Sequence, residues 1–236
     1  GPKIKKPKHI FFIVGESIPQ WSLDETHKLL NICPGLWDFK SQPNTVQIPN
    51  FLPAGNVSRP SIVSLMSGIY DAGLELNERE QFWNGSFPTS FAYQMKQLGY
   101  QTIYWYGGNA SYGNFNHFGK AQGFDRVESA SIFCGPDAPK TWVGVYDHIF
   151  LENIEQQIKA IDTPTFHFIY TTSNHSPYRI EDSLLDYDPE KVMPDVGDDL
   201  RSNKVRNKQF ATYRYSDKAI FTFVESKKET FPDSLF

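Results

Sequence analysis

The sequence lacks several features that would have narrowed its function at once. No apolar run approaches the roughly 20 residues that a membrane-spanning helix needs. Cysteine is scarce: Cys33 and Cys134 lie far apart and outside any CxxC pattern, which argues against a structural zinc site built from thiolates. Whether these two thiols pair in an oxidising compartment or stay free is open at this level. Internal repeats and low-complexity tracts are absent as well.

An excess of basic charge is also missing. The 236 residues carry 23 Lys and Arg against 27 Asp and Glu, a formal net charge of −4, and no basic stripe follows the first eight residues. We therefore expect no nucleic-acid partner. The length and a hydrophobic content of 39% suit one folded domain.

The first eight residues are set apart from the rest. Gly1-Pro2 has the form of the scar left by a cleaved tag. The basic stretch that follows is either a solvated terminus or a tether that follows a membrane span in the parent protein, and its lysines are Lys3, Lys5, Lys6 and Lys8. We expect residues 1–8 to be tag remnant and tether, and residues 9–236 to be a single domain.

Apolar runs and helical spacing alternate along the chain. Strands are predicted in the apolar run within residues 9–16, which Gly15 closes ahead of Glu16, and at residues 45–48, 100–106 and 165–172, with residues 231–236 approaching another. Helices are predicted at residues 21–30, from about residue 60, and at 87–98, 142–161 and 204–228, the first of them ending near Pro34-Gly35. Residues 184–199 are predicted to form a surface excursion. This alternation predicts an α/β fold with a mostly parallel sheet flanked by helices.

Three polar residues stand where such folds place their sites: Glu16 and His175 follow predicted strands, and Ser58 lies just ahead of a predicted helix. The helix N-terminus favours an anion beside Ser58. The Ser58 oxygen can attack phosphorus or sulfur if a divalent metal lowers the proton affinity of that oxygen. Glu16 is a natural ligand for such a metal. The alternatives are structural. Ser58 can be a helix cap, Glu16 a capping or ion-paired carboxylate, and His175 a member of its own turn.

A loop rich in aromatic and amide side chains, residues 107–117, follows the predicted strand at 100–106. It can bind a polyol or sugar head group by stacking and hydrogen bonding, or it can be a stiff structural loop. Asn109 lies in this loop and is a candidate for substrate binding. The histidines show no metal-ligand spacing such as HExxH.

Several short segments occur in order along nearly the whole chain, and they are residues 11–16, 56–61, 64–68, 106–108, 114–118, 123–125, 142–147, 171–178 and 213–225. With them the sequence resembles the lipoteichoic acid synthase-like phosphoglycerol transferases of the sulfatase and alkaline phosphatase superfamily. The segment Thr-Thr-Ser-Asn-His-Ser-Pro-Tyr at 171–178 is the most specific to the teichoic-acid-type branch.

The resemblance implies an alkaline phosphatase-like fold at the extracytoplasmic face of the cell membrane, anchored by a span. It implies metal-dependent transfer of a phosphoglycerol-type group from a phospholipid donor to a glycan or lipid acceptor, through a phosphoryl-serine intermediate and with one Mn, Mg or Zn ion. A phosphodiesterase or phosphonate-type hydrolase, in which water is the acceptor, is one alternative. A non-catalytic binding domain that retains the fold is the other.

Carried over by position, the resemblance makes Glu16 a metal ligand, Ser58 the nucleophile and a second metal ligand, and His175 a contact of the transferred group. Arg59, beside Ser58, joins Asn109 as a further candidate for substrate binding. The branch commonly has threonine as nucleophile, so Ser58 is a mild departure. Sulfatases proper have a cysteine there and an arginine four residues later, where this chain has Ser58 and Ile62.

One part of the family pattern is not found. Its remaining metal ligands are an Asp-His pair at the end of a strand that should begin near Leu235, and the sequence ends at Phe236. The sequence therefore resembles an amino-terminal part of the catalytic domain, truncated before the last strands. Because divalent ions usually need at least four donors, we expect this chain by itself to be inactive or severely impaired.

Overall fold

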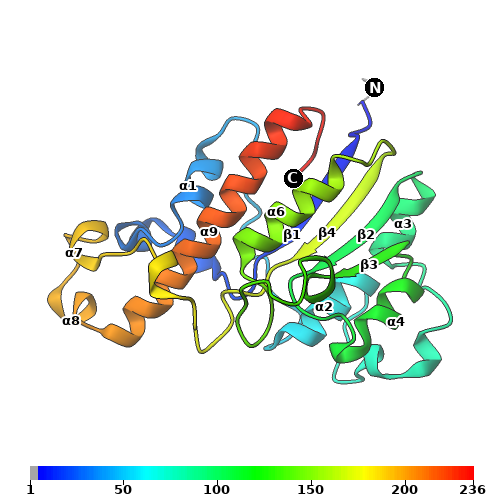
Figure 1. The fold of residues 1–236 in the computed structure, drawn as a ribbon, viewed down its shortest axis with the longest axis horizontal. Coiled ribbons are helices and arrows are strands. Elements are labelled where there is room, and N and C mark those ends of the chain that lie inside the picture. Colours follow the sequence, from blue (N-terminus) through cyan, green and yellow to red (C-terminus); the bar gives the residue numbers. More distant parts are fainter. Residues whose placement is uncertain (1–4) are drawn as a thin grey trace.

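The computed structural model describes residues 5–236, so Gly1, Pro2 and Lys3 of the expected tag remnant and tether lie outside the described residues. The described chain contains a four-stranded, wholly parallel sheet in the order β1-β4-β2-β3 (Figure 1). Its strands are β1 (His9–Val14), β2 (Gln101–Tyr106), β3 (Arg126–Ser129) and β4 (Thr165–Tyr170). The predicted α/β fold with a parallel sheet flanked by helices is confirmed.

Helices cover both faces of the sheet, because successive strand residues point to opposite sides and both sides are apolar. Phe12 and Phe168 pack on one face with α2, α3 and α4, whereas Phe11 and Ile169 pack on the other with α6 and α9. Figure 1 shows α6 and α9 running alongside each other. These helices are α2 (Ser58–Ser67), α3 (Phe91–Gln97), α4 (Phe115–Ala121), α6 (Asp147–Ile158) and α9 (Lys204–Thr230).

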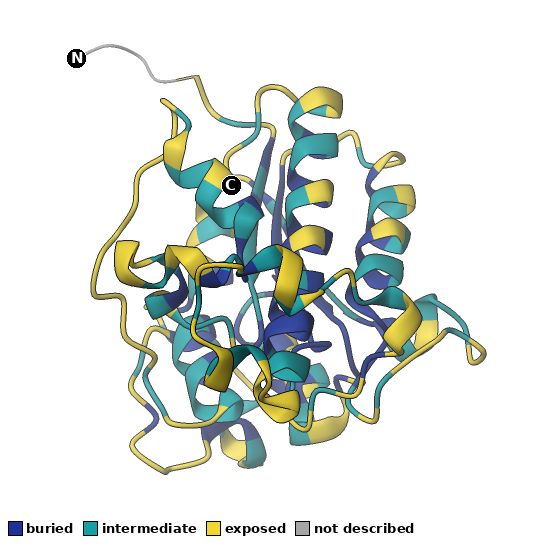
Figure 2. Ribbon diagram, turned by 90° about the vertical axis from the view of Figure 1, so that its left-hand side faces the viewer, coloured by how far each residue is buried: buried dark blue, intermediate teal, exposed yellow. Residues whose placement is uncertain are grey.

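Shorter elements complete the described chain. The α-helices among them are α1 (Pro34–Ser41), α5 (Ala130–Phe133), α7 (Pro189–Val192) and α8 (Asp198–Arg201). The 3₁₀ helices are η1 (Gln20–Leu23), η2 (Glu25–Leu30), η3 (Leu76–Glu78), η4 (Glu80–Phe82), η5 (Tyr112–Asn114) and η6 (Asp182–Leu184). Figure 2 shows the result, with the strands buried inside and the outer helix faces exposed.

Two predictions before the second helix were wrong. Residues 21–30 form η1 and η2 instead of one α-helix, and Pro34 begins a helix instead of ending one. The reason for α1 is tertiary: the Asp217 carboxylate of α9 accepts hydrogen bonds from the backbone N–H groups of Gly35 and Leu36, at 2.7 and 2.9 Å. Capping by a distant carboxylate satisfies N–H groups that a helix start leaves free.

The strand predicted at residues 45–48 was also wrong. Val46 and Ile48 are exposed, and prolines at 43 and 49 enclose them, so the segment has no sheet to join. The short strand β3 was not predicted, because its residues include the charged Arg126 and Glu128.

The predicted surface excursion at residues 184–199 includes α7, the end of η6 and the start of α8. One of its side chains, Met193, is nevertheless buried against α9. Cys33 and Cys134 are free thiols.

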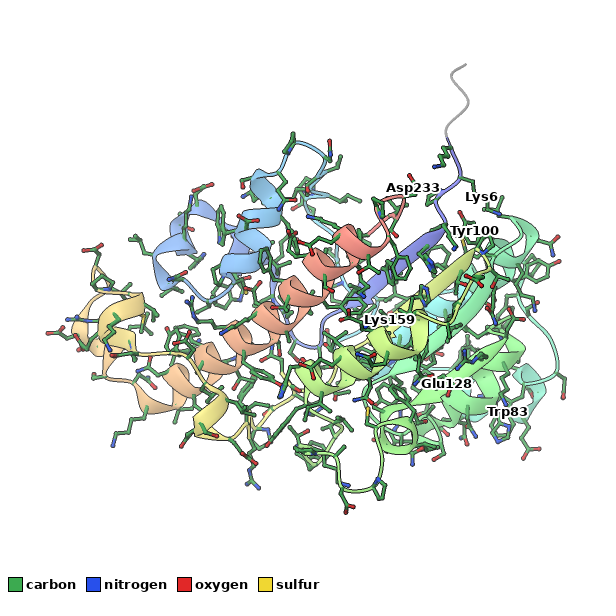
Figure 3. All side chains as sticks on the ribbon, turned by 45° about the horizontal axis from the view of Figure 1, so that its top comes forward. Lys6, Trp83, Tyr100, Glu128, Lys159 and Asp233 are labelled. Atoms are coloured by element: carbon green, nitrogen blue, oxygen red, sulfur yellow. The ribbon has the colours of Figure 1, made fainter. Side chains whose placement is uncertain are left out.

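Both described ends of the chain lie at the same end of the sheet (Figure 1). Leu235 pairs with the outer edge of β1: its carbonyl accepts from Phe11 N at 2.8 Å and its N–H donates to His9 O at 3.0 Å. This agrees with the prediction that residues 231–236 approach another strand. Lys6 lies over the Tyr100 ring, and Figure 3 shows the two side by side. Within residues 5–236 no helix is long and apolar enough to span a bilayer.

A row of polar rings crosses the face of the sheet beneath α9. Trp105 Nε1 donates to His167 Nδ1 at 3.1 Å, and the other ring nitrogen of His167 lies 3.1 Å from His9 Nδ1. The indole N–H can only donate, so Nδ1 of His167 is the acceptor and its Nε2 carries the proton given to His9. Both histidines are buried, and burial lowers the pKa of each ring.

Candidate active site at the carboxyl ends of the strands

Glu16 and Ser58 meet at the carboxyl end of the sheet. Glu16 follows β1 after Gly15, and Ser58 is the first residue of α2. The Ser58 hydroxyl donates to the Glu16 carboxylate, with Oγ at 2.9 Å from Oε2 and 3.1 Å from Oε1. Glu16 is only 7% exposed, whereas Ser58 is half-buried. The structure therefore joins a shielded carboxylate to a hydroxyl that solvent still reaches.

Several hydroxyl groups surround the Glu16 carboxylate. Ser17 Oγ donates to Oε1 at 2.7 Å, and the Tyr170 hydroxyl donates to Oε2. The backbone of Glu16 is held as well, since its N–H donates to Thr171 Oγ1 at 3.2 Å and its carbonyl accepts from Asn174 Nδ2 at 3.1 Å. No lysine or arginine of residues 5–236 forms an ion pair with this carboxylate. The negative charge of Glu16 is therefore stabilised by hydrogen bonds from neutral hydroxyl groups.

Tyr170 is a site residue that sequence reasoning missed. It ends β4, and its ring stacks on Tyr106 of β2 with centroids 5.3 Å apart and planes 8° from parallel. Burial, then the charge of Glu16, raises the pKa of Tyr170 well above its usual value, and burial raises the pKa of Tyr106 to about 12. Both phenols remain protonated donors at neutral pH. The available signal was that Tyr170 ends a predicted strand, at the same sheet edge as Glu16.

Asp147 is a second residue that was missed, although it lies in one of the segments of the resemblance. Its buried carboxylate accepts from the backbone N–H groups of Thr172 and Ser173, at 3.1 and 3.0 Å, and from Ser216 Oγ at 3.0 Å. Burial raises the pKa of Asp147 despite these donors. The carboxylate fixes the loop after β4, which carries His175.

Arg59 is held beside the site by two partners. Its Nη1 donates to Glu78 Oε1 at 3.0 Å, and its guanidinium lies 5.1 Å from the centre of the exposed Tyr112 ring. Glu78 also accepts from Asn114. The positive charge of Arg59 acts to lower the pKa of Tyr106, but burial raises that pKa by more.

The other two substrate-binding candidates are engaged within their own loops. Asn109 is exposed, and its Oδ1 accepts from Ser111 N and Oγ at 3.0 and 2.6 Å, which are the contacts of a structural loop. His175 Nδ1 lies 2.6 Å from Ser176 O, and its ring meets Trp142 edge to face at 5.0 Å. Because a carbonyl only accepts, Nδ1 carries the proton and Nε2 is the basic nitrogen of the neutral ring.

The donors fit a divalent cation in kind but not in number. Glu16 and Ser58 are oxygen donors of the type that Mg²⁺ and Mn²⁺ prefer, and the Glu16 carboxylate is buried. Within residues 5–236, however, no group of three or more His, Cys, Asp or Glu side chains is placed to hold a metal ion. These residues therefore form one side of a metal site and do not complete it.

Comparison with known proteins places the chain in a family. Residues 8–231 match the sequence model of the sulfatase family, so the chain belongs to that family. No curated protein matches it. This agrees with the resemblance to lipoteichoic acid synthase-like enzymes, which lie in the same superfamily.

Solved structures share the fold at low sequence identity. The lipoteichoic acid synthase LtaP from Listeria monocytogenes superposes with a TM-score of 0.76 and 18% identity over 97% of this chain and 54% of its own. An alkaline phosphatase superfamily protein from Vibrio parahaemolyticus has a TM-score of 0.74 and 21% identity, over 98% of this chain and 53% of its own. The C-terminal periplasmic domain of EcEptC from Escherichia coli has a TM-score of 0.66 and 16% identity, over 95% of this chain and 60% of its own. The chain thus spans about half to three-fifths of these structures, and the likeness shows a common fold.

Proposed function

We propose that this protein takes part in metal-dependent transfer of a phosphoglycerol-type group from a membrane phospholipid to an acceptor hydroxyl on a glycan or lipid. The observation that carries the proposal is the contact of Ser58 Oγ with both oxygens of Glu16, at 2.9 and 3.1 Å, at the start of α2. A hydroxyl at a helix N-terminus lies where backbone N–H groups favour an anionic substrate. Membership of the sulfatase family, whose shared fold this is, supports an enzyme.

The reaction follows in two steps. In the first, Ser58 Oγ gives up its proton and forms a bond to the donor phosphorus, the bond from phosphorus to the diacylglycerol oxygen breaks, and that oxygen takes up one proton in exchange for the one that Ser58 lost. In the second, the acceptor hydroxyl gives up its proton and forms the new bond to phosphorus, the bond from phosphorus to Ser58 Oγ breaks, and Ser58 regains a proton. Glu16 accepts the hydrogen bond that orients Ser58 before attack. Arg59, fixed by Glu78 and Tyr112, lies beside the site to contact phosphoryl oxygens, and His175 Nε2 is a proton acceptor for the acceptor hydroxyl.

A divalent Mn, Mg or Zn ion, held on one side by Glu16 and Ser58, would lower the proton affinity of the serine and offset phosphoryl charge. The resemblance implies an Asp-His pair as the remaining donors. Since residues 5–236 supply only the first two, we propose that the chain of 236 residues has little or no turnover by itself.

We propose an extracytoplasmic location, at the membrane surface where the donor lipid is found. The basic charge before β1 supports this, because lysines beside a membrane span are attracted to anionic lipid head groups. The match to a domain described as periplasmic in EcEptC is consistent with it. We propose that residues 9–236 belong to a single catalytic domain, of which they supply one side of the metal site.

The test uses the product of the complete gene, incubated with phosphatidylglycerol vesicles, an acceptor and Mn²⁺. Diacylglycerol released together with phosphoglycerol on the acceptor is the expected result, whereas free glycerol phosphate alone would identify a hydrolase. Ser58→Ala should abolish product, and Ser58→Thr should retain part of it. Ser41→Ala is the matched control, because the Ser41 hydroxyl is exposed and donates only to the Asp38 carbonyl of its own helix, α1. Full turnover in Ser58→Ala would remove Ser58 from the mechanism.

A further inference from the structure

The amide of Asn174 holds the turn that follows β1. Its Nδ2 lies 3.1 Å from the carbonyl oxygen of Glu16 and 3.1 Å from that of Ser17. A carbonyl oxygen only accepts, and an amide nitrogen carries two hydrogens, so Nδ2 donates one hydrogen to each carbonyl. Asn174 is 0% exposed, although it lies in a loop. Because β1 has ended at Val14, the strand ladder no longer supplies donors for these carbonyls, and the amide takes that place.

The turn has a conformation that a serine adopts only at a cost in free energy. Ser17 has a φ of +51°, in the left-handed region that favours glycine. With this backbone, Ser17 Oγ donates to the Glu16 carboxylate, at 2.7 Å from Oε1. Backbone strain of this kind persists only where the surrounding structure fixes it, and Asn174 bonds to the carbonyl of the strained residue itself. The amide therefore stabilises a turn that directs a donor toward Glu16.

The oxygen of the same amide is left without a partner. Asn174 Oδ1 is buried, and within residues 5–236 no group donates a hydrogen bond to it. Reversing the amide would not pair it, because Oδ1 would then face two carbonyl oxygens. A buried acceptor without a donor is rare in folded proteins and calls for a reason. The contact with the turn supplies that reason, since it uses both hydrogens of the amide.

The loop that carries Asn174 is fixed from two sides. The Asp147 carboxylate accepts hydrogen bonds from two of the backbone N–H groups of this loop, at 3.0 and 3.1 Å. Thr171, at the start of the loop, accepts from the Glu16 N–H at 3.2 Å through Oγ1. His175 follows Asn174 directly. One fixed loop thus both holds the backbone of Glu16 and carries the proposed proton acceptor.

We infer that Asn174 is a positioning residue, which fixes the backbone of residues 16 and 17 so that the Glu16 carboxylate stays directed at Ser58. The fixing of the turn stands on these contacts alone. Its importance for turnover rests on the proposed function, in which Glu16 orients Ser58 before attack. Loss of the amide should therefore misplace Ser58 without removing any group that contacts the donor.

The first measurement uses the chain of 236 residues and needs no turnover. Hydrogen exchange at the Glu16 N–H, which donates to Thr171, reports whether the turn stays closed. In Asn174→Ala this N–H should exchange about tenfold faster or more, beyond any change at the Ile169 N–H within β4. Asn174→Asp should have a larger effect, because its carboxylate oxygens would face two carbonyl oxygens. A side chain that only fills space predicts the opposite order, since aspartate has nearly the volume of asparagine.

The second measurement uses the complete gene product. Asn174→Ala should lower kcat about ten- to a hundredfold and leave KM within about twofold, because the groups that bind the donor remain while Ser58 is misplaced. Asn153→Ala is the matched control. The half-buried Asn153 amide also donates to a backbone carbonyl, but that carbonyl belongs to Ile149 of its own helix, α6. This control should change neither kcat nor the exchange at Glu16.

The outcomes separate the positioning role from the proposed reaction. Unchanged exchange at Glu16 in Asn174→Ala, or a smaller effect in Asn174→Asp than in Asn174→Ala, would overturn the inference. Faster exchange with unchanged kcat would overturn it too, because the direction of Glu16 would then not matter. Circular dichroism checks that each variant is folded, and exchange in Asn174→Asp decides the role if Asn174→Ala does not fold. Full turnover in Ser58→Ala would instead remove the proposed reaction, and hydrogen exchange would still decide whether Asn174 fixes the turn.

Discussion

Tyr170, the last residue of β4, donates its hydroxyl hydrogen to the same Glu16 oxygen that lies 2.9 Å from Ser58 Oγ. The contact exists because β1 and β4 are neighbours in register, with Val14 opposite Tyr170. It places a protonated phenol, itself buried, between the sheet and the proposed nucleophile. Tyr170 is therefore part of the support that fixes the direction of the Glu16 carboxylate.

Removing this hydroxyl should destabilise the fold. In Tyr170→Phe the buried carboxylate loses a donor, and hydrogen bonds to charged groups are worth about 1.5–3 kcal/mol, so we expect a loss of that size in the free energy of unfolding. Urea denaturation of the chain measures it. Tyr104→Phe is the control: the Tyr104 hydroxyl is buried without a hydrogen-bond partner among the described residues, so its removal should be neutral or stabilising. A neutral Tyr170→Phe would contradict the role given to the contact.

Asp147 should matter for the loop that carries His175. Asp147→Ala leaves two backbone N–H groups and the Ser216 hydroxyl without their acceptor, and each buried donor so stranded costs about 1–3 kcal/mol. We therefore expect a loss of at least about 3 kcal/mol in the free energy of unfolding. Hydrogen exchange should show faster exchange at Thr172 and Ser173. Asp162→Ala, at an exposed aspartate, is the control and should change stability by no more than about 0.5 kcal/mol.

Stability should fall in mild acid because of the buried histidines. Burial, with Lys8 and Lys227 nearby, lowers the pKa of His9 from 6.5 to about 4, and burial lowers the pKa of His167 well below 6.5. The unfolded chain takes up these protons near pH 6.5, whereas the folded chain does not, so the stabilisation is complete above that pH. It is lost as the pH falls from 6.5 toward 4, with a slope of up to about 1.4 kcal/mol per pH unit for each histidine.

Urea midpoints measured across this range, with constant ionic strength, check the expectation. His117→Gln should leave the slope unchanged, because His117 is exposed. Burial also raises the pKa of Asp217 to about 6, so the folded chain takes up that proton before the unfolded chain does, which offsets part of the loss below pH 6. NMR titration of the two rings therefore completes the test, and a ring protonated in the folded chain above pH 6 would contradict the expectation.

Much of the fold was readable from local pattern. The runs that became β1, β2 and β4 are apolar on both faces, and such runs fit few structures other than a buried parallel strand. The periodicity of α9 persists over 27 residues, which leaves little ambiguity. Pro60, which fits the first turn of a helix, predicted a helix from about residue 60 with Ser58 just ahead of it, and α2 begins two residues earlier, at Ser58 itself. The placing of Glu16 at the end of a strand was likewise local.

Only the tertiary structure decided which of these residues meet. Glu16 and Ser58 lie 42 positions apart, and Tyr170 lies 154 positions from Glu16, so no spacing in the sequence indicates either contact. The start of α1 depends on Asp217, a carboxylate 182 positions from Gly35. Composition and periodicity determined the elements, because propensity and burial act over a few residues. Strand order and register determined the site, because they bring together groups that are distant along the chain.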